Sequence, residues 1–239
     1  MKNFALTIVL LSPAANLLAG STDSVQTSEG VLKITPVTHG SLMLEFKGKV
    51  IHIDPWGRGD YTGLPKADLI LITDIHGDHL DPAQVKKLKK SGTQVVAPQA
   101  VAQSVTEAVV LHNGQKKVVA GLEIEAVAMY NHTRGPSPGK LYHDKGRGNG
   151  YVLALGGKRV YISGDTACIP EMKALADIDI AFVTMNLPYT MPPEEAAECV
   201  AAFKPEIVYP YHYRGSDLNA FTRALETHPD IEVRLRDWY

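Results

Sequence analysis

The chain contains little cysteine. Cys168 and Cys199 are the only two cysteines among its 239 residues, and they do not form a Cys-x-x-Cys pair. A zinc site built from thiolates is therefore not expected. The two side chains are able to form a disulfide, but we favour two buried free thiols, because unpaired cysteine packs as a small hydrophobic residue.

A surplus of one charge sign is also absent. The chain has 24 lysine and arginine residues against 26 aspartate and glutamate residues, a net charge of −2 at pH 7. No long block of one sign occurs, so no nucleic-acid partner is expected. Hydrophobic residues make up 45% of the chain, as in ordinary globular proteins. The length suits one α/β domain better than two.

The apolar stretch at the N-terminus is too short for a membrane-spanning helix, and no stable membrane insertion is expected. Lys2 precedes an almost wholly apolar run over residues 4–11, and small apolar residues over 14–20 lead into polar residues. This layout is typical of a secretory signal peptide. We predict that residues 1–20 are a signal peptide, that residues 21–239 form a single domain, and that the protein is exported to the periplasm. A disordered or buried N-terminal segment is the alternative.

From residue 31 onward, short apolar runs alternate with turn residues. Strands are predicted over residues 31–35, 41–46, 50–54, 67–73, 95–97, 117–129 (two strands around Gly121), 150–155, 158–163, 178–185, 207–211 and 232–235. Helices are predicted over residues 82–91, 170–175, 192–203 and 217–227. The first has Asp81 as its N-cap and Gly92 as its C-terminal cap. Strands followed by strand-helix alternation in both halves indicate an α/β fold, a four-layer α/β/β/α sandwich.

One loop is dense in metal-competent side chains. Asp74, His76, Asp78 and His79 lie within six residues, directly after the predicted buried strand 67–73. Such a turn can direct Asp74 and His76 one way and Asp78 and His79 the other, so two neighbouring metal ions could share it. Imidazole and carboxylate suit Zn²⁺ and its first-row neighbours. Singly, these residues would be polar loop or capping side chains; their density at a strand end favours metal binding.

Three further candidates each follow a predicted strand. They are His132, Asp165 and His212. A lone histidine is more often a hydrogen-bonded or surface residue than a ligand. Because all three occupy strand ends, they are expected at the same edge of the sheets as the loop, which favours a shared metal centre.

In this order the seven residues resemble the metallo-β-lactamase superfamily. That family has a His-x-His-x-Asp-His loop, then a histidine, an aspartate in a Gly-Asp-Thr turn and a late histidine. The resemblance covers residues 31–239 and is greatest to the compact branch that contains L-ascorbate-6-phosphate lactonases and related metal-dependent hydrolases. It implies a binuclear metal site in a hydrolase domain. The first metal would take Asp74, His76 and His132, the second Asp78, His79 and His212, and Asp165 would bridge them.

Asp74 departs from the family pattern, which has histidine at this position. A third carboxylate lowers the net charge of two divalent ions and their carboxylates from about +2 to about +1. The ligand set of the first site also becomes harder, in the sense of hard and soft ligands, because a carboxylate replaces an imidazole. Mn²⁺ and Fe²⁺ are therefore alternatives to Zn²⁺. Replacing Asp74 with histidine is expected to restore the usual ligand set.

The implied chemistry is attack by a metal-bridged hydroxide on an ester, a lactone or a phosphodiester. By resemblance, Asp78 is both a ligand and the catalytic residue that orients the hydroxide. Asp54 is either a turn carboxylate or a partner that orients a ligand imidazole.

Contacts to a small-molecule substrate are expected from two segments. Residues 130–147 form a long polar loop whose basic residues, Arg134 among them, would suit an anionic substrate or simply be solvated. Tyr189 follows another strand and could reach the pocket. His39, between the first two predicted strands, is interpreted as a surface histidine, with a position near the site as the alternative.

Two other functions remain open. One is an exported metal-binding or ligand-binding protein with a weakened catalytic site, although all seven positions keep metal-competent side chains. The other is a β-lactamase, which also fits an exported protein, but fold alone does not give the substrate.

Overall fold

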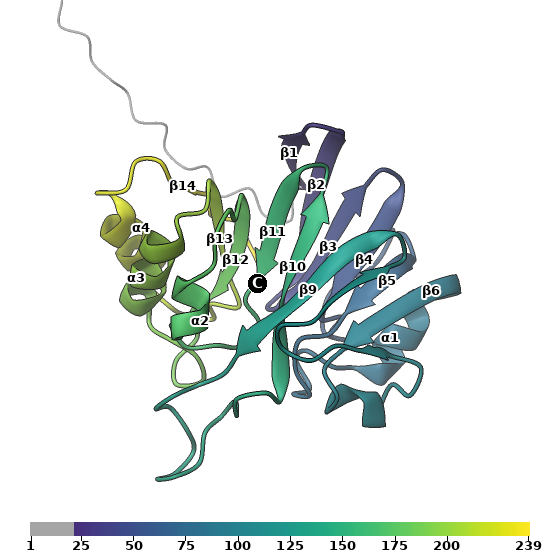
Figure 1. Cartoon of the computed structure of the whole chain (residues 1–239), viewed down its shortest axis with the longest axis horizontal. Helices are drawn as coiled ribbons and strands as arrows, with labels where there is room; N and C mark the ends of the chain where they lie inside the picture. The colour runs from purple at the N-terminus through teal and green to yellow at the C-terminus, as the bar shows by residue number, and fades with distance from the viewer. Residues whose placement is uncertain (1–21) are drawn as a thin grey trace, which may run out of the picture.

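The structure is a computed structural model that describes residues 22–239 (Figure 1). The predicted signal peptide, residues 1–20, lies outside the described residues. Within them, the strands form two seven-stranded sheets. None of the helices in this part of the chain is long and apolar enough to cross a membrane.

The first sheet follows the order of the sequence. Its strands are β1 (Asp23–Thr27), β2 (Gly30–Thr38), β3 (Ser41–Phe46), β4 (Lys49–Ile53), β5 (Ala67–Leu71), β6 (Lys89–Ala97) and β7 (Val109–Val110). Strands β1 to β4 are antiparallel, and β4 to β7 are parallel. Strands β1 and β7, at the two edges, were not predicted.

The second sheet repeats this plan. Its strands are β8 (Lys116–Val119), β9 (Leu122–Met129), β10 (Gly148–Leu155), β11 (Lys158–Ile162), β12 (Ile180–Thr184), β13 (Ile207–Tyr211) and β14 (Glu232–Val233). Strands β8 to β11 are antiparallel and β11 to β14 parallel. The central parallel strand β12 is buried along its whole length, which explains its continuous apolar run IAFVT.

Helices cover the outer faces of both sheets. Helix α1 (Pro82–Leu88) packs on the first sheet, followed by a short 3-10 helix, η1 (Val101–Gln103). Helices α2 (Pro170–Lys173), α3 (Pro193–Phe203) and α4 (Leu218–Leu225) lie together on the second sheet (Figure 1). Between the sheets, Leu44 and Ile51 share one apolar core with Leu153 and Phe182. The predicted four-layer α/β/β/α sandwich is confirmed.

Helix α1 begins as predicted but ends early. The carboxylate of Asp81 accepts hydrogen bonds from the backbone N–H groups of Ala83 at 3.0 Å and Gln84 at 3.1 Å. The predicted C-terminal cap at Gly92 is wrong, because the helix stops at Leu88 and the chain continues as β6. Pairing of β6 with β5 competes with the helix for these residues, and tertiary contacts override local propensity.

The two cysteines form a disulfide, so the interpretation as free thiols is wrong. Cys168 and Cys199 lie 5.5 Å apart at their Cα atoms. The bond joins the segment after β11 to helix α3. Their proximity follows from the packing of α3 on the second sheet, and a separation of 31 residues in the sequence gives no sign of it.

Candidate metal centre

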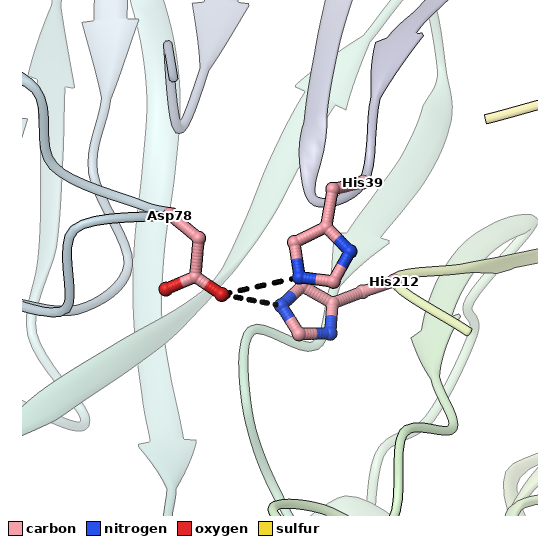
Figure 2. A group of neighbouring side chains, drawn as sticks. All are labelled: His39, Asp78 and His212. Carbon is pink, nitrogen blue, oxygen red and sulfur yellow. Dashed lines mark hydrogen bonds and ion pairs between the residues drawn. The ribbon is translucent and has the colours of Figure 1, made fainter. Parts of the chain in front are cut away.

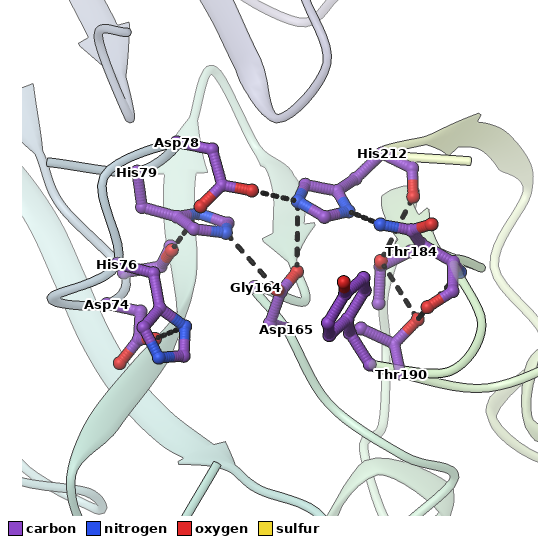
Figure 3. A network of polar contacts seen from close by, with 12 residues as sticks. Asp74, His76, Asp78, His79, Gly164, Asp165, Thr184, Thr190 and His212 are labelled. Atoms are coloured by element: carbon purple, nitrogen blue, oxygen red, sulfur yellow. Dashed lines mark hydrogen bonds and ion pairs between the residues drawn. The ribbon is translucent and has the colours of Figure 1, made fainter. Parts of the chain in front are cut away.

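Acidic and histidine side chains from both sheets meet at one edge of the sandwich. The loop after β5 supplies Asp74, His76, Asp78 and His79, and the end of β13 supplies His212. Asp165, in the turn after β11, lies between these two groups (Figure 3). The structure therefore brings together six of the seven residues that the sequence selected.

Asp165 is the centre of the group. Its Oδ2 lies 3.2 Å from His79 Nε2 and 3.3 Å from the Nε2 of His143. Its Oδ1 lies 3.4 Å from His212 Nε2. Burial would raise the pKa of Asp165, but the nearby imidazoles of His212 and His79 hold it well below its usual range. The carboxylate is thus ionised and contacts histidines from three separate segments.

Four of these atoms are buried and lack a hydrogen-bond partner among the described residues. They are His79 Nε2, His143 Nε2, His212 Nε2 and Asp165 Oδ1. A buried polar atom without a partner is costly, and native proteins satisfy nearly all of them. Imidazole nitrogen and carboxylate oxygen are also the ligand atoms that divalent metals prefer. The residues present therefore fit metal ions.

Three sets of side chains each have potential ligand atoms within 4.8 Å of one another. The sets are Asp74, His76 and His143; His79, Asp165 and His212; and His39, Asp78 and His212. The first set has no residue in common with the other two, which share His212. This division agrees with two neighbouring sites on either side of Asp165.

His79 is oriented by Asp54, which ends β4. The Asp54 Oδ2 lies 2.7 Å from His79 Nδ1, and the same carboxylate accepts hydrogen bonds from the Thr73 backbone N–H at 2.7 Å and hydroxyl at 2.5 Å. Burial lowers the pKa of His79, but Asp165 and Asp54 together raise it well above its usual value. With its Nδ1 proton donated to Asp54, His79 presents Nε2 to the centre. Of the two interpretations of Asp54, the structure favours the orienting partner.

His39 is buried at the metal centre, so its interpretation as a surface histidine is wrong. Its side chain is 1% exposed, and its ring centroid lies 3.6 Å from that of His212. His39 Nε2 lies 3.1 Å from Asp78 Oδ2, and His212 Nε2 lies 3.5 Å from the same oxygen (Figure 2). Burial would raise the pKa of Asp78, but the contacts with His212 and His39 hold it far below its usual range.

The backbone of these two histidines is unusual. His39 and His212 have positive φ angles of 53° and 49°, which non-glycine residues rarely adopt. The His212 N–H donates to the His39 carbonyl at 3.0 Å, and the His39 N–H donates to the Trp238 carbonyl at 2.9 Å. Left-handed residues often occur at functional sites, where surrounding contacts maintain them. The sequence analysis did not include His39 among the site residues, because the contacts that hold it inward come from Trp238 and His212, far along the chain.

Asp74 is fully buried and neutralised by a cation. Arg147 donates to Asp74 Oδ1 from Nε at 3.2 Å and to Oδ2 from Nη2 at 3.0 Å, while His76 Nδ1 lies 2.9 Å from Oδ2. Burial would raise the pKa of Asp74, but His76, His79 and Arg147 lower it to about 2. The net charge of about +1 that the sequence analysis expected for the centre is thus corrected, because the positive charge of Arg147 offsets the negative charge of the third carboxylate.

His132 does not join the centre, and His143 takes its place. His132 is exposed and lies beside Cys168 and Lys173 on the surface. His143 is 1% exposed, and its Nδ1 lies 2.6 Å from Asn131 Oδ1. The Asn131 N–H also donates to the His143 carbonyl at 2.9 Å, which closes the loop and places His143 inward. The sequence analysis chose His132, the first histidine after β9. Closure of the loop instead directs the second, His143, to the centre.

A cavity of about 310 Å³ opens onto the centre. Beyond the histidines and aspartates, its walls are formed by Tyr142, Asn186, Tyr189 and Arg214. Tyr189 therefore lies where the sequence analysis expected a substrate contact. Arg134 does not line this cavity; its guanidinium pairs with both oxygens of Glu195, at 3.2 and 2.6 Å. The prediction that Arg134 contacts substrate is corrected, because helix α3 supplies it with a carboxylate partner.

Known proteins resemble the chain over most of its length. A family model described as the beta-lactamase superfamily domain matches residues 33–212. A UPF0173 metal-dependent hydrolase from Thermococcus onnurineus is 35% identical over 179 residues, which are 69% of this chain and 77% of the relative. Another from Methanopyrus kandleri is 31% identical over 199 residues, covering 76% and 84% of the two chains.

Solved structures agree with this relationship. A protein from Parabacteroides distasonis assigned as a metal-dependent hydrolase superposes with a TM-score of 0.86 at 44% identity, covering 92% of this chain and 99% of that one. Igni18, a metallo hydrolase from Ignicoccus hospitalis, superposes with a TM-score of 0.71 at 26% identity, covering 85% and 94% of the two chains.

Proposed function

Because the chain belongs to the β-lactamase superfamily and is a metal-dependent hydrolase, we propose that it uses two divalent metal ions to hydrolyse an ester, a lactone or a phosphodiester. The convergence of three imidazole nitrogens on the Asp165 carboxylate carries this proposal: these buried atoms lie 3.2 to 3.4 Å from it, and His79, His143 and His212 Nε2 make no regular hydrogen bond there. A structural polar cluster would join such buried atoms in regular hydrogen bonds.

The residues divide between two sites. Asp74, His76 and His143 would hold one ion; Asp78, His79 and His212 would hold the other; Asp165 would contact both. Histidine and carboxylate ligands favour Zn²⁺, and the buried Asp74 keeps Mn²⁺ and Fe²⁺ as alternatives. Bound ions of this kind supply an acidified water molecule and polarise the oxygen of the bond to be cleaved.

Asp78 has the freedom that a catalytic carboxylate needs. Both of its contacts in the centre, with His39 and His212, are made through Oδ2. Its side chain is 32% exposed and lines the cavity, so Oδ1 can orient an attacking water molecule by accepting a hydrogen bond from it. His39 keeps the carboxylate in place for that contact.

Metal analysis and a substrate panel test the proposal. Protein purified without chelator should contain about two equivalents of metal and should hydrolyse at least one of a 4-nitrophenyl ester, a γ-lactone and bis(4-nitrophenyl) phosphate. Asp165→Asn should lower both metal content and turnover by orders of magnitude with an unchanged circular dichroism spectrum. Asp230→Asn, at an exposed position outside the centre, is the matched control. A fully active metal-free protein would overturn the proposal.

We further propose that the protein is exported. The N-terminal sequence pattern supports this, and so does the disulfide between Cys168 and Cys199, because such bonds persist in oxidising compartments. N-terminal sequencing of protein from the native host should find a mature chain that starts at about residues 20 to 24. An intact Met1 on protein from the cytoplasm would contradict export.

A further inference from the structure

The cavity over the metal centre has one cationic side chain in its wall, that of Arg214. We propose that Arg214 binds an anionic group of the substrate, so that the enzyme acts on small molecules that carry a carboxylate or phosphate beside the bond to be cleaved. The inference rests on the proposed hydrolytic function and names its substrate class.

The other basic candidates are either paired or away from the cavity. Residues 130–147 were expected to supply positive charge, but Arg134 pairs with Glu195, Lys145 with Glu171 and Arg147 with Asp74. Lys140 forms no ion pair in the described part of the chain, but it does not line the cavity. Within the described residues that line the cavity, Arg214 is the only lysine or arginine. It forms no ion pair in residues 22–239 and is exposed at this wall. A guanidinium without a carboxylate partner beside a reaction centre is suited to bind an anion.

The backbone of Arg214 is held close to the metal centre. It lies two residues after His212, and its N–H donates to the Tyr239 hydroxyl at 2.7 Å. The same hydroxyl lies 2.6 Å from His39 Nδ1, so the segment is tied to a residue that contacts Asp78. The backbone from which the guanidinium extends is therefore anchored beside the reacting group, which keeps a bound anion near it.

The remaining walls indicate the size and character of the rest of the substrate. Tyr142 and Tyr189 form an edge-to-face pair with ring centroids 5.0 Å apart, which offers an apolar surface. Asn186 is 4% exposed and offers an amide to the cavity. A volume of about 310 Å³ is small for a ligand pocket, so the substrate is a small molecule and not a polymer segment.

Three esters with matched acyl chains test the proposal. They are the 4-nitrophenyl esters of butyric acid, succinic acid and 3-phosphonopropionic acid, which end in a methyl, a carboxylate and a phosphonate. The metal-loaded enzyme should have a higher kcat/KM for a charged ester than for the butyrate, by about threefold to tenfold, since an ion pair at a cavity mouth is partly screened by water. The better of the two charged esters identifies the anion.

Substitution of Arg214 separates this proposal from the proposed function. Arg214→Gln should lower kcat/KM for the charged ester to the level of the butyrate, whereas Arg223→Gln, which removes an exposed arginine of helix α4, should keep the preference. An unchanged preference in Arg214→Gln would overturn the role of Arg214. If wild type cleaves none of the esters, the hydrolytic proposal is in question instead. Calorimetry then decides on Arg214: succinate should bind more tightly than butyrate, and only Arg214→Gln should remove the difference.

Discussion

Arg147 holds Asp74 through two parallel hydrogen bonds, of 3.2 Å from Nε to Oδ1 and 3.0 Å from Nη2 to Oδ2. The pair joins the strand-end loop after β5 to the loop before β10. The guanidinium offsets the negative charge of Asp74, at the position where this chain departs from the family pattern. Histidine at position 74 would leave Arg147 without this partner.

This pairing changes what Asp74→His should do. On its own, the substitution places an imidazole against an unpaired guanidinium, so metal affinity at the first site should fall about tenfold or more. In Asp74→His/Arg147→Gln the affinity should recover, with a coupling free energy of about 1–3 kcal/mol between the two positions. Titration calorimetry with Zn²⁺ on wild type, both single variants and the double variant measures it. Additive effects would show that Arg147 is unrelated to the metal site.

The fold was largely predictable because its signals are local. Apolar runs such as 67–73 and 178–185 become the buried strands β5 and β12, and the Asp81 cap starts α1 as predicted. The failures occur where distant pairing decides the structure. Gly92 looks like a helix cap, but its segment pairs with β5, and β1 owes its strand conformation to pairing with β2.

The site was predictable only where ligands follow strands directly. Asp165 and His212 do so, and the structure brings both to the centre. His143 lies in the middle of a loop, and its position depends on closure by Asn131. His39 is inward because Trp238, 199 positions further along the chain, accepts its N–H. No local pattern reports contacts of that range.

His143 and His132 form a natural pair for testing the ligand set. We expect His143→Ala to lose about one metal equivalent per chain, because it removes a buried imidazole from the first site. His132→Ala, at an exposed position, should keep the full metal content and turnover. Elemental analysis after gel filtration distinguishes the two. Metal loss in His132→Ala alone would restore the ligand set expected from the sequence.

Asp23 gives the fold a pH-dependent contribution far from the metals. Burial would raise its pKa, but the Tyr209 hydroxyl, the Ser24 N–H, Arg236 and Arg234 bring it below the ordinary value of 3.8. A carboxyl with a lowered folded-state pKa stabilises the fold above its unfolded-state value, and the contribution is lost as the pH falls through the folded-state value. Asp23→Asn should therefore lower stability at pH 7 and have less effect below about pH 4. Urea unfolding at several pH values measures this, with Asp230→Asn as the control. A pH-independent difference would assign the effect to packing.

Tyr239 fixes the proton arrangement at His39. The ionised Asp78 can only accept hydrogen bonds, so His39 Nε2 must carry the proton that it donates to Oδ2 at 3.1 Å. Burial lowers the pKa of His39 and keeps the ring neutral, although Asp78 acts in the opposite direction. In a neutral ring Nδ1 is then an acceptor, and the Tyr239 hydroxyl at 2.6 Å is its donor. The hydroxyl oxygen in turn accepts the Arg214 N–H.

Tyr239→Phe removes this donor and keeps the ring that packs edge-on against His39. The imidazole is then free to rotate or change tautomer, so Asp78 is held less firmly. We expect kcat for an uncharged ester to fall about fivefold to tenfold, with its KM and the metal content of the enzyme nearly unchanged, since a hydrogen bond of this kind contributes about 1 kcal/mol. Tyr213→Phe is the control: its hydroxyl contacts the backbone of Arg236 and Trp238, so it should cost stability alone. Equal kcat losses in both variants would show that Tyr239 only holds the C-terminal segment in place and does not act through His39.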